Sequence, residues 1–184
     1  MTSFIPSLRA SETPPNPNVQ TDPQAAALGS AATAPVPWSA ALARKTDELI
    51  AQDDLNLSRL LGLFRQAYMP VESSHDGHRL LLRMESGLTL AVAADAPRRL
   101  IAMAAVFQLH PQADMADKLA AANRINDGMV VLRAAIPDPK TLYLDHHLVC
   151  DGGVMAATVI GAVRRMERFV ASAIGEHVPP ALLA

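Results

Sequence analysis

Residues 113–176 constrain the fold most, because this stretch switches twice between a helical and an extended pattern of apolar side chains. Residues 129–136 and 141–150 are extended runs, separated by a short turn that carries two prolines. Runs of this kind indicate strands, whereas apolar side chains three and four residues apart indicate a helix with one buried face. The stretch therefore predicts a helix, a β-hairpin and a second helix.

The first of these helices is expected to start at Asp114 and to end at Gly128, which can take the left-handed conformation that closes many helices. Lys118 is expected to point away from the buried face of the helix. That face comprises Met115, Leu119, Ala122 and Ile125.

The second helix is expected to be capped by Asp151 and to stop before the pair Pro179-Pro180. Gly152 and Gly153 allow a tight turn between the preceding strand and this helix. The alternative is that the same turn directs backbone amides at an anion. The apolar stripe of the helix comprises Met155, Val159, Ala162, Met166, Val170 and Ala173.

Upstream, residues 57–68 carry apolar side chains at helical spacing, with Asn56 or Asp54 as the candidate cap and Pro70 as the stop. A leading helix is expected over residues 40–52, capped by Ser39.

From residue 71 the pattern becomes extended. Turn residues at 85–87 separate two alternating runs, which predicts a hairpin. Residues 100–109 form a third apolar run, for which a strand is favoured over a helix because the run is short and bounded by turn residues. The predicted order is a leading helix followed by αβββαββα. This is an α+β fold in which helices pack on one face of a largely antiparallel sheet.

The chain has 184 residues, which suits one domain, and we place that domain at residues 38–178. Residues 1–37 are rich in proline and alanine and are expected to form a disordered tail. Residues 179–184 are expected to form a short C-terminal tail. Trp38 is expected to pack on the domain, with anchoring of a partner as the alternative.

Composition excludes several classes of protein. The formal net charge is −2, so there is no bulk attraction to nucleic acid or to an anionic membrane. Cys150 is the single cysteine, which excludes a scaffold held by disulfides. No secretory signal and no membrane-spanning run is evident, so a cytoplasmic location is expected.

Two asparagines and a glycine pair carry a family resemblance. Asn123 and Asn126 lie near the end of the predicted helix, and Asp151-Gly-Gly153 precedes the last helix. Over residues 54–176 the chain resembles the YbjN-like family, described as putative bacterial sensory transduction regulators and similar in fold to type III secretion chaperones. The resemblance implies a non-enzymatic, chaperone-like or regulatory protein that binds segments of partner proteins.

The two asparagines also have a structural explanation. Spaced three residues apart at a helix end, Asn123 and Asn126 share a face. They are therefore placed to satisfy open backbone carbonyls or the edge of the following strand, with ligand contact as the alternative.

The run from Asp145 to Cys150 is the strongest candidate for site chemistry. His146 and His147 point to opposite faces of the predicted strand, so they do not readily bind one ion together. A zinc or copper site would need further ligands from His75, His78 or His110. Cys150 ends an apolar run, which is a poor setting for a reactive thiol. We therefore assign no catalytic, cofactor-binding or metal-binding residue.

The sequence thus predicts a binding protein without enzymatic activity, which acts through its sheet face or an exposed edge strand and is a candidate homodimer. The partner is expected to be a protein, not nucleic acid or a membrane. The alternative is a small metal-dependent or small-molecule enzyme that uses His146, His147 and Cys150.

Overall fold

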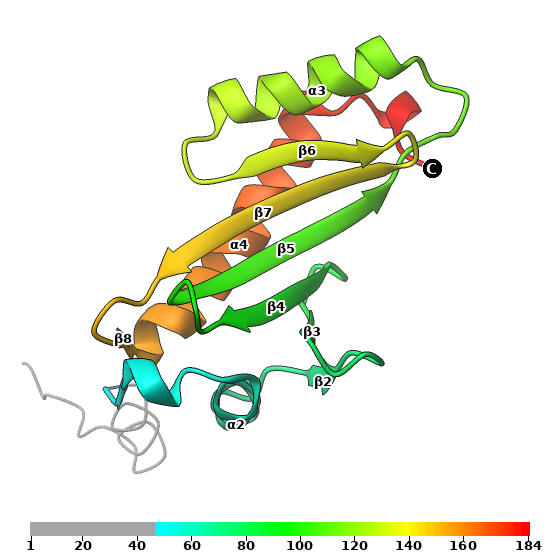
Figure 1. The fold of residues 1–184 in the computed structure, drawn as a ribbon. Helices are drawn as coiled ribbons and strands as arrows, with labels where there is room; N and C mark the ends of the chain where they lie inside the picture. The colour runs from blue at the N-terminus through cyan, green and yellow to red at the C-terminus, as the bar shows by residue number, and fades with distance from the viewer. Residues whose placement is uncertain (1–46) are drawn as a thin grey trace, which may run out of the picture. The chain divides into compact units, whose positions relative to one another are not determined.

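The computed structural model describes residues 47–184, in which six strands form one antiparallel sheet (Figure 1). The strands are β2 (Val71–Ser73), β3 (Leu80–Arg83), β4 (Thr89–Asp95), β5 (Leu100–Gln108), β6 (Arg133–Asp138) and β7 (Thr141–Val149). Their order across the sheet is β2-β3-β4-β5-β7-β6. Strands β2 and β6 are therefore its two edges.

Within residues 47–184, three helices pack on one face of this sheet. They are α2 (Leu57–Gln66), α3 (Met115–Gly128) and α4 (Ala156–His177). Figure 1 shows α4 crossing behind the central strands, with α2 near the β2 edge and α3 beside β6. Buried residues of all three helices and of the strands belong to one apolar cluster. The predicted α+β class, with helices on one face of an antiparallel sheet, is confirmed.

The alternation of apolar residues decides which side of each strand enters this core. On β5, Ile101, Met103 and Ala105 are buried and meet the apolar stripe of α4, which includes Val159 and Met166. Burying an aliphatic side chain of this size stabilises the fold by about 1.5–3 kcal/mol. Strand β5 pairs with β4 on one side and β7 on the other, which confirms the strand prediction for this run.

Local signals placed most helix boundaries correctly. Asn56 caps α2, because its Oδ1 accepts a hydrogen bond of 2.9 Å from the backbone N–H of Arg59. Asp114 caps α3 by accepting from the N–H of Ala116 at 3.2 Å. Helix α4 ends at His177, just before the two prolines.

The leading helix predicted over residues 40–52 is wrong in its described part, and residues 40–46 lie outside the described residues. Strand β1 (Leu49–Ile50) pairs with β8 (Val154–Met155) in a separate two-stranded sheet, and a 3-10 turn follows at Gln52–Asp54. The backbone partner comes from about 100 residues away in sequence, so a local pattern did not reveal it. The predicted tail of residues 1–37 and Trp38 also lie outside the described residues.

The predicted strand order omitted β2. Strand β2 pairs with β3 around the turn at Asp76-Gly77, so four strands, not three, separate α2 from α3. Gly77 has a φ of +69°, as a tight turn at this point requires.

Two predicted helix caps are wrong. Gly128 has no positive φ and lies in the last turn of α3. A Cβ at this position would lie 3.0 Å from Nε2 of His177, so glycine here permits the close approach of the end of α4. Asp151 precedes α4 by several residues, and its carboxylate instead forms an ion pair of 3.3 Å with Arg99.

The buried face of α3 is rotated from the predicted one. Met115 and Leu119 are exposed, whereas Lys118 is buried and its Nζ donates a hydrogen bond of 2.7 Å to the carbonyl oxygen of Pro139. That carbonyl belongs to the turn between β6 and β7, so the ammonium satisfies an acceptor that no strand partner reaches.

The C-terminal residues 179–184 pack against the domain instead of extending as a tail. A 3-10 turn, Pro180–Leu182, places the Leu182 side chain in the core. The Leu182 carbonyl accepts a hydrogen bond of 2.8 Å from the N–H of His110, and the N–H of Ala184 donates to the Gln108 carbonyl at 3.1 Å.

Candidate protein-binding face of the sheet

The second face of the sheet carries no helix within residues 47–184 (Figure 1). We call this side, formed by the residues of β3, β4, β5, β7 and β6 that alternate with the buried ones, the open face. A sheet face left uncovered by its own helices is a natural place for a partner to bind if it is apolar, because exposed apolar patches mark interaction sites.

The centre of the open face is a floor of four alanines. The strand register sets Ala91 opposite Ala104 and Ala93 opposite Ala102, so the four side chains form a two-by-two block on adjacent central strands. We call this block the alanine floor. Because each alanine projects only a Cβ, the floor is lower than the side chains around it.

Larger apolar side chains surround the alanine floor. Val106 and Val149 are exposed on β5 and β7, and Leu81 and Leu100 are partly buried on β3 and β5. Register places all four on the open face, since each alternates with a core residue. The open face is therefore apolar at its centre.

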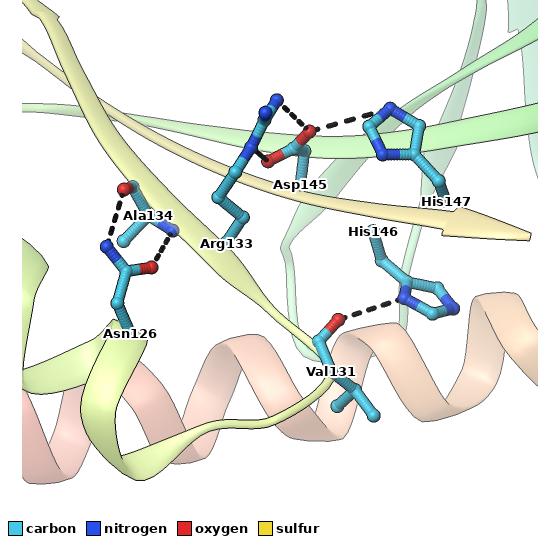
Figure 2. Close-up of polar contacts among 7 residues, drawn as sticks. All are labelled: Asn126, Val131, Arg133, Ala134, Asp145, His146 and His147. Carbon is cyan, nitrogen blue, oxygen red and sulfur yellow. Dashed lines mark hydrogen bonds and ion pairs between the residues drawn. The ribbon is translucent and has the colours of Figure 1, made fainter.

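One side of the open face holds a buried carboxylate (Figure 2). Asp145 on β7 is paired in register with Arg133 on β6, and the guanidinium binds both of its oxygens, at 2.9 Å from Nε and 2.7 Å from Nη2. The hydrogen bonds to Asp145 raise the pKa of Arg133 above its ordinary value. Nε2 of His147 lies 3.6 Å from the same carboxylate. This arrangement fixes the edge strand on β7.

The two edges of the sheet are poorly suited to accept another strand. On β6, the side chain of Asn126 accepts from the N–H of Ala134 at 2.7 Å and donates to its carbonyl at 3.0 Å (Figure 2). The predicted structural role of Asn126 is confirmed, while Asn123 is exposed. Strand β2 has three residues and follows Pro70, and short edges of this kind resist strand addition.

The structure does not bring the candidate metal ligands together. Nδ1 of His146 lies 2.9 Å from the carbonyl oxygen of Val131, on the side opposite His147 (Figure 2). Across residues 47–184 no three His, Cys, Asp or Glu side chains are arranged to hold a metal ion, and this set includes His75, His78 and His110.

Cys150 is buried next to the core side of the sheet, and its Sγ lies 3.4 Å from the carbonyl oxygen of Leu148. Burial raises the pKa of the Cys150 thiol. A thiol of this kind holds its proton at neutral pH, which is the opposite of what a nucleophile needs.

We therefore expect the folded protein to react with an aromatic disulfide reagent at pH 8 at least ~100-fold more slowly than the urea-unfolded chain, because the thiolate forms only on local opening. The absorbance of the released aromatic thiolate measures both rates. Equal rates for the folded and unfolded protein would show an accessible, reactive thiol and would revive the nucleophile hypothesis.

The glycine pair forms the predicted tight turn. Gly152 and Gly153 have φ values of +75° and +113°. The N–H of Gly152 donates to Oε1 of Gln52 at 3.2 Å, and that of Gly153 donates to the Cys150 carbonyl at 3.0 Å. Because both amides are already engaged, the anion-binding alternative loses its donors.

A cavity of about 580 Å³ lies beside the turn between β3 and β4 and is lined in part by α4. Three arginines, Arg83, Arg164 and Arg168, line it together with Glu85 and Glu167, so most of its positive charge is offset. Oε1 of Glu167 accepts from the N–H and Oγ of Ser86, at 3.1 and 2.6 Å. These bonds tie the turn to α4, and we interpret the contact as structural.

A family model decides the classification of the chain. The YbjN model, described as "Putative bacterial sensory transduction regulator", matches residues 56–173. The chain belongs to the YbjN family. That description is of a regulator and not of an enzyme. No curated protein matches the chain.

A solved structure supports the same fold. The chain is similar to the crystal structure of YbjN from E. coli, titled a "putative transcription regulator", with a TM-score of 0.56 and 21% sequence identity. The likeness covers 70% of this chain and 95% of the E. coli one. In the described part of the chain, no helix is both long and apolar enough to cross a lipid bilayer.

Proposed function

We propose that this YbjN-family chain is a non-enzymatic regulator that binds a segment of a partner protein on the open face of its sheet. The observation that supports this most directly is the alanine floor, a low apolar surface at the centre of a sheet face that no helix of residues 47–184 covers. The uncovered face of an antiparallel sheet is ordinarily polar, whereas this one is apolar at its centre.

The face is a better candidate than the edges. Asn126 already occupies both outward backbone groups of Ala134 on β6, and β2 offers three residues. Strand addition needs a run of free N–H and C=O groups at an edge, which neither β2 nor β6 offers. Binding on the open face uses side chains instead, so it requires no rearrangement of the edges. A cytoplasmic location and a chaperone-like mode of action are part of this proposal.

A photo-crosslinking amino acid at Val106 should capture the partner, whereas the same residue at Leu119 should not. Both side chains are exposed, but Val106 lies on the open face and Leu119 lies on the outer side of α3. Crosslinked species are identified by mass spectrometry from cells of the source bacterium. A light-scattering measurement on the purified chain shows whether a second copy is the captured partner.

Charge introduced on the face gives an independent test. The double variant Val106→Glu, Val149→Glu should weaken binding of the captured partner by at least ~10-fold, because it desolvates two carboxylates in an apolar interface. The matched control is Leu119→Glu, Val130→Glu, which changes two exposed apolar residues elsewhere. Equal crosslinking at Val106 and Leu119, with equal effects of the two double variants, would refute the open face as the binding surface.

A further inference from the structure

Four arginines surround the alanine floor and indicate which partner it fits. Arg83 and Arg133 lie on the open face of β3 and β6, as the register with Thr89 and Asp145 shows. Arg98 lies in the turn after β4, where it bonds Asp95. Arg79 directly precedes the buried Leu80 and so points to the open face. We call these four residues the arginine rim.

Each rim arginine is paired with a carboxylate that is less exposed than the arginine itself. The contrast is largest for two pairs: the side chain of Arg133 is 69% exposed and that of Asp145 3%, and the values for Arg98 and Asp95 are 78% and 29%. It is smaller for the other two, with 75% and 59% for Arg83 and Glu72, and 56% and 41% for Arg79 and Asp76. The formal charges cancel, but the cations are nearer to solvent. A partner approaching the face therefore meets guanidinium groups first.

The pairs leave hydrogen-bond donors unused. A guanidinium has five N–H donors, and the bidentate pair of Arg133 with Asp145 engages two of its nitrogens. The remaining donors can bind carboxylates of a partner without breaking the pair. Interfaces commonly combine an apolar centre with a polar rim rich in arginine, which is the arrangement on this face.

Resting on the proposed function, we propose that the open face binds a linear segment of another protein in which leucine- or phenylalanine-sized side chains are flanked by aspartate or glutamate. The apolar side chains lie against the alanine floor, and the acidic ones pair with the arginine rim. The chain's own residues 1–46 do not match this chemistry, because Glu12 and Asp22 are their only acidic residues. The occupant is therefore a separate protein.

Binding of labelled synthetic peptides, measured by fluorescence anisotropy at low salt, tests this chemistry on the full chain. A peptide with leucines flanked by glutamates should bind. The versions with lysine in place of glutamate, or serine in place of leucine, should bind at least ~10-fold more weakly. Raising the salt concentration should weaken binding of the glutamate peptide but not of its lysine version, because salt screens the attraction between glutamate and arginine.

Charge reversal on the rim should remove this preference. The variant Arg83→Glu, Arg98→Glu should lose at least ~10-fold in affinity for the acidic peptide. The matched control Arg65→Glu, Arg165→Glu makes the same change in net charge on α2 and α4, away from the open face, and should retain the affinity. Circular dichroism confirms that both variants fold.

The acidic-partner inference is overturned if the lysine peptide binds as well as the glutamate peptide, or if the control variant loses as much affinity as the rim variant. Crosslinking at Val106 without any binding of the acidic peptide would overturn the inference and leave the proposed function standing. Loss of crosslinking at Val106 overturns both. A dimer of the purified chain that the rim variant dissociates would identify the occupant as a second copy, against the inference.

Discussion

Replacing Gly153 by alanine is expected to destabilise the domain by about 3 kcal/mol. A Cβ at this position would lie 2.7 Å from the carbonyl oxygen of Ile50, which is closer than real Cβ contacts come. The φ of +113° lies beyond the left-handed region that other residues adopt. Steric overlap and backbone strain therefore act together. Chemical denaturation of the purified chain measures the loss.

Gly152→Ala is the matched control. Gly152 also has a positive φ, of +75°, but a Cβ there would meet no atom within 4 Å, so only backbone strain remains and we expect a loss of about 1 kcal/mol. Hydrogen exchange of the Leu49 and Ile50 amides should rise in Gly153→Ala and much less in Gly152→Ala. Equal losses for the two variants would show that the approach of β1 to this turn does not determine stability.

The same glycine shows where prediction from the sequence succeeds and where it stops. The turn residues of the chain and the helical spacing after Asn56 are local signals, and they gave the helices, the hairpins and the α+β class. The partner of Gly153 is Ile50, about 100 residues away, and no pattern within a window of sequence reports such a contact. For this reason the sequence pattern assigns β1 to the leading helix and β8 to the start of the last helix.

Lys118 illustrates a second limit. Helical periodicity assigned it to solvent, because charged side chains rarely enter a core. In the structure the open carbonyl of Pro139 lies within reach and the side chain is buried. The orientation of α3 depends on the turn it packs against, and that turn is contributed by residues beyond the helix.

The open face was only partly predictable. The sequence shows that Asp145 and His147, two residues apart on one strand, share a face. In the structure Nε2 of His147 lies 3.6 Å from Oδ2 of Asp145. The alanine floor had a signal in the alternate alanines at 91, 93, 102 and 104, but alanines alone do not show which face is covered. The pairing of Arg133 with Asp145 requires the register between β6 and β7, which the sequence does not specify.

Arg133→Ala is expected to destabilise the domain by about 2 kcal/mol, because it leaves the Asp145 carboxylate buried without its bidentate partner. The Asp145 side chain is 3% exposed, and only His147 would remain near it, at 3.6 Å. The expected loss is not larger, because the Arg133 side chain is largely exposed and its removal uncovers little apolar surface. Urea denaturation measures the change in unfolding free energy.

Arg83→Ala is the matched control on the same face. Its ion pair with Glu72 is 3.6 Å long and both side chains are exposed, so we expect a loss below about 0.5 kcal/mol. In the Arg133→Ala background, Asp145→Asn should restore part of the lost stability, because a neutral amide of the same shape costs less to bury than an unpaired carboxylate. Two results would contradict this account: a loss of stability in Arg133→Ala no larger than that in Arg83→Ala, or no recovery on adding Asp145→Asn. Either would mean that the burial of Asp145 does not make this ion pair strong. The arginine rim would then be held by surface contacts alone.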